Sequence, residues 1–187
     1  MPEADAKAEL RRSLRARRAG RGEDERARAG EALAGYAAAL GPGPIAAFVG
    51  VFGEPPTLAL LAALHERGVR VLLPLLRDDL DLEWVVFEGD AGQLVRGRHG
   101  VLQPAGESLG LGGIAEAALV LAPALAVDSA GRRLGQGGGS YDRALTRTSA
   151  PVLAVVFDDE LLESVPVQAH DRPVNGTLTP LGGVRLV

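Results

Sequence analysis

Residues 45–73 alternate apolar runs with a loop and an amphipathic segment, and this order limits the folds open to the chain. The run Ile45–Val49 is bounded by turn residues, as a buried strand would be. After a loop rich in glycine and proline, Thr57 stands at the N-cap of a helix predicted over 58–67. The run Val69–Leu73 predicts a second strand. A strand, a helix and a strand in this order form a βαβ unit, whose strands pair in parallel.

The remaining elements continue this alternation. Helices are predicted over 5–20 and 24–40, from Ser140 onward, and over 158–165; strands are predicted over 82–87, 117–121, 152–157 and 183–187, with 88–113 irregular. We therefore predict one α/β domain over residues 1–187, with three αβα layers and a mostly parallel sheet. In open sheets of this kind, ligands bind beyond the carboxyl ends of the strands. The loops carrying Glu54, the glycine run 135–139 and Asp158 are expected to line one crevice.

Composition excludes several classes of protein. The 187 residues include no cysteine and three histidines, which argues against disulfides and a zinc cluster. The N-terminus is charged, and no apolar run approaches the ~18 residues of a membrane span. A net charge of −4 argues against general nucleic-acid binding. We expect a cytoplasmic protein with no membrane or nucleic-acid partner.

The first predicted helix carries a basic stripe. Lys7, Arg11, Leu14 and Arg18 lie on one helical face because they are spaced at i, i+4, i+7 and i+11. The stripe fits either a solvated basic face or a cationic arm laid across phosphate groups. The second interpretation requires the stripe to face inward.

The glycine run is the strongest indication of a ligand site. Glycines fill four of the five positions 135–139, so no side chain blocks a ligand from the backbone amides. Arg132 and Arg133 precede the run and supply positive charge, and Asp142 offers a carboxylate to a divalent cation. A phosphate there would also meet the N-terminus of the helix predicted from Ser140. A chain with 25 glycines also allows a plain connecting loop.

The order Asp128-x-x-Gly131-x-Arg133-Leu-Gly-x-Gly-x-Gly-x-Tyr141-Asp142 resembles the signature of the 5-formyltetrahydrofolate cyclo-ligases, also called 5,10-methenyltetrahydrofolate synthetases. Further segments match the family in the family's own order. They are Lys7-x-x-x-Arg11, Gly53-Glu54-x-x-Thr57, Gly100 to Pro104 and Pro166-x-x-x-His170-Asp171. The resemblance implies the three-layer fold that this family shares with ribose-phosphate isomerases and CoA transferases.

The resemblance also implies roles for individual residues. ATP contacts are implied for Lys7, Arg11, Arg133, Leu134, Gly135, Gln136, Gly137, Gly138, Gly139, Ser140 and Tyr141. Folate contacts are implied for Val51, Glu54, Gln136, Gly138 and Ser140. Asp142 and Asp171 would bind Mg²⁺, and Tyr141 and Arg133 would be catalytic.

The implied reaction is the ATP-dependent conversion of 5-formyltetrahydrofolate to 5,10-methenyltetrahydrofolate by a monomer, through a phosphorylated formyl group. This chain departs from the family's usual pattern at Ser140, Gln136, Pro56 and His99. We expect these departures to touch the folate pocket more than the phosphate and Mg²⁺ positions.

Two other functions remain open from the residues alone. An enzyme of the same fold class that isomerises a sugar phosphate or transfers CoA would need a positioned carboxylate and no ATP. A non-catalytic nucleotide- or RNA-binding module would use the basic first helix. The two aspartates at 142 and 171 favour the ligase, since a pure binder has no evident use for paired Mg²⁺ carboxylates.

Overall fold

The computed structural model describes residues 2–97, 100–166, 168 and 171–187. Its main sheet has seven strands in the order β12-β11-β9-β6-β1-β2-β3. Their bounds are β1 (Ile45–Ala46), β2 (Val71–Leu76), β3 (Leu82–Phe87), β6 (Leu119–Pro123), β9 (Val152–Val155), β11 (Gly176–Thr179) and β12 (Gly183–Leu186). The central strands from β11 to β2 pair in parallel, and the edge strands β3 and β12 are antiparallel. The prediction of a mostly parallel sheet is therefore confirmed.

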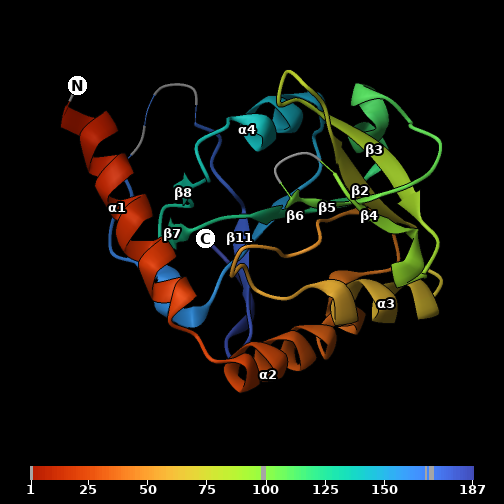
Figure 1. Ribbon diagram of the computed structural model, residues 1–187, viewed down its shortest axis with the longest axis horizontal. Coiled ribbons are helices and arrows are strands. Elements are labelled where there is room, and N and C mark those ends of the chain that lie inside the picture. Colours follow the sequence, from red (N-terminus) through yellow and green to blue (C-terminus); the bar gives the residue numbers. More distant parts are fainter. Residues whose placement is uncertain (1, 98–99, 167, 169–170) are drawn as a thin grey trace.

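Helices cover both faces of this sheet (Figure 1). The helices are α1 (Pro2–Ala19), α2 (Glu23–Ala34), α3 (Leu58–Glu66) and α4 (Ser140–Ala144), and the 3₁₀ turns are η1 (Ala37–Leu40), η2 (Ala91–Gln93), η4 (Leu111–Glu116), η5 (Leu145–Arg147) and η6 (Asp158–Glu160). One core cluster joins α2 and α3 to the sheet through Leu33 and Leu61, and the other joins η4 and α4 through Ile114 and Ala144. Within the described residues, no helix is both long and apolar enough to cross a bilayer.

Helix α1 lies beside a small second sheet at one side of the molecule (Figure 1). This sheet has the order β10-β7-β8, formed by β7 (Ala126–Asp128), β8 (Arg133–Leu134) and β10 (Leu161–Leu162). Leu14 of α1 is 1% exposed and packs with Leu125, Leu134 and Val165 in a third apolar cluster. Strand β8 leads directly into the glycine run, so this packing places α1 against it.

The βαβ unit is present, with Ile45 of β1 opposite Val71 of β2 in parallel register. The strand predicted over 45–49 is shorter, because only its first two residues pair as a strand. Beyond them the Thr57 hydroxyl donates to the Phe48 carbonyl at 2.6 Å and accepts from the Gly50 amide at 2.9 Å. Thr57 precedes α3 as predicted, but its side chain closes the loop over 50–57 and does not cap the helix.

Three other predictions differ from the structure, and one strand of the main sheet was not predicted. The helix predicted over 24–40 breaks after Ala34 into α2 and η1. The prediction of a helix over 158–165 is wrong, because η6 ends at Glu160 and the chain then extends into β10. The buried carboxylate of Glu160 accepts a hydrogen bond from the Phe157 amide. Within the region read as irregular, β4 (Leu94–Arg96) and β5 (Leu102–Pro104) form a hairpin. Strand β11 was not predicted because Gly176-Thr-Leu-Thr carries a single large apolar side chain.

Candidate active site

One cavity of about 650 Å³ gathers nearly all of the predicted site residues. It is lined by Lys7, Arg11, Val51, Glu54, Arg133, the loop 135–139, Ser140, Tyr141, Asp142 and Asp171. Leu134 is the exception, because its side chain is 1% exposed and packs in the cluster around Leu14. The remaining wall is largely apolar and includes Phe48, Leu76, Leu82 and Leu102. A cavity with one charged wall and one apolar wall suits a ligand pair of mixed polarity.

The basic stripe of α1 faces inward. Lys7 is 3% exposed and forms an ion pair with Asp171. Arg11 lies one turn further along and donates through Nε to the Gly135 carbonyl at 2.9 Å. Arg15, one more turn along, donates to the Gln136 carbonyl at 2.7 Å. Arg15 was not predicted as a site residue, although it continues the i, i+4 spacing of Lys7 and Arg11.

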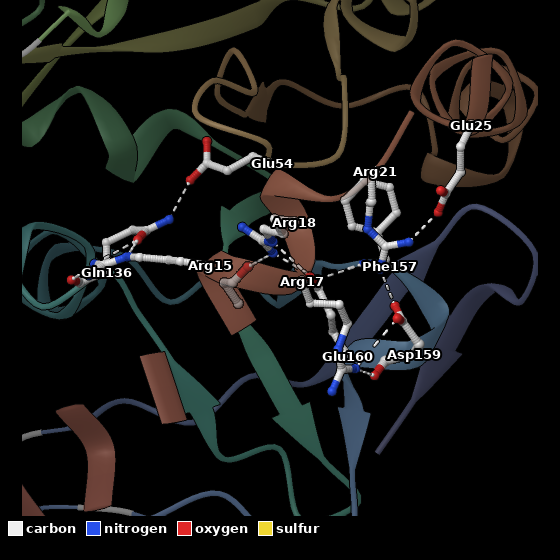
Figure 2. A network of polar contacts seen from close by, with 11 residues as sticks. Arg15, Arg17, Arg18, Arg21, Glu25, Glu54, Gln136, Phe157, Asp159 and Glu160 are labelled. Carbon is white, nitrogen blue, oxygen red and sulfur yellow. Dashed lines mark hydrogen bonds and ion pairs between the residues drawn. The ribbon is translucent and has the colours of Figure 1, made fainter. Parts of the chain in front are cut away.

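The C-terminal end of α1 is held by a buried ion pair (Figure 2). Arg18 donates to both carboxylate oxygens of Glu160 at 2.7 Å and to the Ala124 carbonyl at 2.5 Å. Beside this pair, the Arg21 guanidinium lies 4.0 Å from the centre of the Phe157 ring. Removing one partner of such a pair leaves a buried charge, so the pair strongly favours one position of the helix. The role of Glu160 was not predicted, because its partner lies 142 positions away.

The glycine loop lines the cavity and contains amides that make no hydrogen bond within the described residues. Among the described residues, none accepts a hydrogen bond from the amides of Gly137, Gly138 or Gly139. Gly137 has φ +109° and Gly139 has φ +70°, and residues other than glycine disfavour this backbone conformation. The helix that follows, α4, has only five residues, so the loop amides rather than a helix dipole would carry anion binding.

A buried carboxylate lies opposite the glycine loop. Glu54 is 7% exposed, and it accepts from the Val51 amide and from the Gln136 carboxamide, each at 3.1 Å. Burial raises the pKa of Glu54, and these two hydrogen bonds act against that rise. The chain of contacts runs from Arg15 through Gln136 to Glu54 (Figure 2). The loop after β1 and the glycine loop are thus joined by one side chain.

Arg133 and Tyr141 line the cavity and have polar groups that could each make a further hydrogen bond. Arg133 donates to Asp142 at 2.5 Å, yet its Nε and the Tyr141 hydroxyl have no hydrogen-bond partner among the described residues. Burial and the charge of Glu54 raise the pKa of Tyr141, so its hydroxyl stays protonated. A buried unpaired donor is costly, and a ligand oxygen would satisfy it. Tyr141 is therefore suited to donate a hydrogen bond and not to act as a base.

The two predicted metal ligands lie in the same part of the cavity. The amide of Arg172, next to Asp171 in sequence, donates to Asp142 at 3.3 Å. The described residues contain no group of three or more His, Cys, Asp or Glu side chains placed to hold a metal. Mg²⁺ commonly binds one or two carboxylates and takes its other ligands from phosphate and water. The donor set therefore fits Mg²⁺ that arrives with a phosphate ligand.

Two predicted positions do not contribute as expected. Pro56 packs against α2, where a methyl group added at Gly30 would lie 3.3 Å from it, so this departure lies away from the cavity. Asp158 accepts from Thr179 at 2.6 Å and supports the β11–β12 turn, so its segment does not line the cavity. His99 lies outside the described residues, as does His170 of the C-terminal motif.

Comparison with known proteins points to one family. A sequence profile of the 5-formyltetrahydrofolate cyclo-ligase family matches residues 3–180. The chain is 40% identical to the 5-formyltetrahydrofolate cyclo-ligase of Mycolicibacterium smegmatis, with 96% of each chain covered. It is 30% identical over 142 residues to that of Escherichia coli K12, covering 73% of this chain and 77% of the relative.

Solved structures agree with this result. The NMR structure of Aquifex aeolicus 5,10-methenyltetrahydrofolate synthetase superposes with a TM-score of 0.80 at 26% identity, covering 96% of this chain and 92% of that one. A synthetase from Mycoplasma pneumoniae superposes with a TM-score of 0.70 at 16% identity, covering 90% and 95%, which shows a shared fold. Lys7 and Arg18 of the stripe on α1 are 3% and 2% exposed, so these two cations are not available to an RNA backbone.

Proposed function

The chain belongs to the 5-formyltetrahydrofolate cyclo-ligase family, and from this premise we propose how its cavity holds the two substrates. Its activity is the ATP-dependent conversion of 5-formyltetrahydrofolate to 5,10-methenyltetrahydrofolate. The observation that carries the proposal is the division of one cavity between a cationic, amide-rich wall and an apolar wall with a buried carboxylate.

ATP lies along the cationic wall. Its phosphates rest on the free amides of 137–139, between Lys7 and Arg11 of α1 and Arg133 of β8. The unpaired Nε of Arg133 supports this placement, because a phosphate oxygen would satisfy it. Asp142 and Asp171 would hold Mg²⁺ together with the phosphates, and the ion would supply positive charge against the transferring phosphoryl group.

The folate lies along the apolar wall with its pterin ring at the deep end. Glu54 accepts hydrogen bonds from the N–H groups of the pterin, since a carboxylate pairs well with two adjacent donors. Gln136 and the Val51 amide hold this carboxylate in place. Gly138 and Ser140 lie where the two substrates meet.

The first chemical step transfers a phosphoryl group. The formyl oxygen attacks the γ-phosphorus of ATP, the bond to the β-phosphate oxygen breaks, and ADP leaves. The product is an iminium phosphate at N5. No protein nucleophile is needed, so the residues act by alignment and by offsetting negative charge. Tyr141 donates its hydroxyl hydrogen bond beside the formyl group, where its burial keeps it protonated.

The second step closes the ring. N10 attacks the formyl carbon, the carbon–oxygen bond to the phosphate breaks, and phosphate leaves with the former formyl oxygen. N10 loses its proton, which gives the methenyl cation. The apolar wall around Phe48 and Leu82 keeps water from the iminium carbon before N10 reaches it.

The remaining features follow from the same premise. We propose that residues 1–187 form one domain of the fold shared with ribose-phosphate isomerases and CoA transferases. One chain supplies both walls of the cavity, which supports a monomeric enzyme. We also propose a cytoplasmic location, where ATP and reduced folates are both available.

Purified protein mixed with ATP, Mg²⁺ and 5-formyltetrahydrofolate tests the proposal. Methenyl absorbance should rise with one ADP released for each methenyl group formed. Omission of ATP or addition of a chelator should stop the rise. Methenyl formation without ATP would contradict the proposed arrangement of substrates.

A further inference from the structure

Phe52 has a backbone conformation that its own side chain disfavours. In the described part of the chain, only Phe52 and Leu80 are non-glycine residues with positive φ, at 51° and 64°. For such residues the left-handed conformation costs roughly 1–2 kcal/mol. Strained residues of this kind cluster at ligand sites, where the surrounding structure holds them. Phe52 belongs to the same loop as Glu54 and lines the same cavity.

The Phe52 side chain is also poorly buried. It is 67% exposed, which is unusual for a large aromatic ring. The ring edge lies against the β4–β5 hairpin, where a Cβ built at Gly100 would stand 3.4 Å from Cζ. Phe52 thus reaches from the loop after β1 to the hairpin. The fold gains little from this placement, because both the strain and the exposed apolar surface weigh against it.

We propose that Phe52 is a specificity-determining residue that stacks on the p-aminobenzoyl ring of the folate. The inference rests on the proposed function, which places the pterin ring at Glu54. A folate consists of a pterin, a p-aminobenzoyl ring and glutamate, joined in that order. Glu54 is 7% exposed and Phe52 is 67% exposed, so the two residues follow the same order from the interior to solvent.

The surroundings of Phe52 favour this ring over the adenine of ATP. Phe52 shares a loop with Glu54, whose carboxylate is proposed to bind the pterin. Val101 and Leu102 of the neighbouring hairpin add apolar surface to the cavity. The phosphate-binding groups lie on α1 and on the glycine loop. A stacked aromatic pair adds affinity beyond the apolar area that it buries.

The test compares four variants by calorimetric titration with 5-formyltetrahydrofolate alone. Phe52→Ala should weaken binding about tenfold, Phe52→Leu nearly as much, and Phe52→Tyr should bind as the parent does. The KM for ATP should stay unchanged in all of them. Phe52→Gly should lose the same folate affinity but raise Tm, because glycine removes the strain at φ 51°. Leu181→Ala, an 85% exposed position in the β11–β12 turn, is the matched control.

A truncated ligand separates the ring from the pterin. 5-Formyltetrahydropterin, which lacks the benzoylglutamate, should bind the parent and Phe52→Ala equally. A selective rise in the KM for ATP would instead assign Phe52 to adenine and overturn the inference. Parent-like binding of 5-formyltetrahydrofolate by Phe52→Ala would overturn this inference alone. A parent protein that binds no 5-formyltetrahydrofolate would overturn the proposed function as well.

Discussion

Lys7 and Asp171, 164 positions apart in the chain, form an ion pair at the wall of the cavity. The pair joins α1 to the segment before β11, and its two side chains are 3% and 14% exposed. Each charge is therefore held in place by its partner, and in the proposed site Lys7 would contact a phosphate and Asp171 its cation. Binding of MgATP would redistribute these contacts: Lys7 turns to phosphate oxygens and Asp171 to Mg²⁺.

Lys7→Met should raise the KM for ATP by about tenfold or more, because a charge-assisted contact to phosphate is lost. An exposed cation would add little to stability. Lys7 is buried, however, so the variant should also lower the free energy of unfolding by about 1–3 kcal/mol. Steady-state kinetics and urea unfolding measure the two effects. Arg12→Met, at an exposed position of the same helix, should change neither, and an unchanged KM in Lys7→Met would exclude the phosphate contact.

Alanine substitutions in the glycine loop should separate strain from ligand contact. A Cβ at Gly138 would meet nothing closer than 3.6 Å, and this residue does not have positive φ, so Gly138→Ala should keep the parent Tm. Its KM for ATP should rise at least tenfold, since the methyl occupies the phosphate position. Gly137→Ala and Gly139→Ala should in addition lower stability by roughly 1–2 kcal/mol, because both have positive φ. Parent-like ATP kinetics in all three variants would remove the phosphates from this loop.

Glu54 should make the protein less stable as pH rises. Burial raises the pKa of its carboxyl in the folded state above the ordinary value of 4.5, so the folded state holds the proton more tightly than the unfolded state. Its effect is therefore absent below pH 4.5 and grows as pH rises to the folded pKa. Glu54→Gln should be more stable than the parent at pH 7 and equal to it near pH 4, while its affinity for 5-formyltetrahydrofolate falls. Thermal unfolding of both proteins between pH 4 and pH 7 tests this prediction. If the two stabilities change in parallel with pH, the raised pKa of Glu54 is contradicted.

Asp142→Asn should separate metal binding from structure. Asparagine keeps an oxygen that can accept from Arg133 and from the Arg172 amide, so the protein should still fold, while Tm should fall because the buried charge of Arg133 loses its carboxylate partner. Loss of the carboxylate charge should lower kcat/KM by about 100-fold and shift the Mg²⁺ titration to higher concentrations. Asp159→Asn, outside the cavity, is the control. An unchanged Mg²⁺ dependence in Asp142→Asn would remove Asp142 as a ligand.

The site was predictable where its residues lie close together in sequence. The glycine loop carries its chemistry in one segment, and Lys7 and Arg11 show their shared face by spacing alone. The partners of Arg15 and Arg18 lie 121 and 142 positions away, so no local pattern could reveal them. The same limit applies to Phe52, whose strain appears only in the folded backbone.

The fold, too, was predictable only where a local sequence pattern marks an element. The βαβ unit was predicted from its apolar runs, whereas β7, β8 and β11 were not. These strands are short and carry few large apolar residues, so tertiary pairing rather than local pattern defines them. The segment 158–165 has helical spacing, but the buried carboxylate of Glu160 ends the turn to bind Arg18.

The most direct test of the proposed mechanism is to measure whether the formyl oxygen is transferred to phosphate. In the proposed arrangement the two substrates lie along different walls of one cavity, so that the formyl oxygen reaches the γ-phosphate. When 5-formyltetrahydrofolate labelled with ¹⁸O in the formyl group is converted in ordinary water, mass spectrometry should find one ¹⁸O in each phosphate released. Unlabelled phosphate, with the label lost to water, would mean that ATP does not phosphorylate the formyl group and would contradict the account.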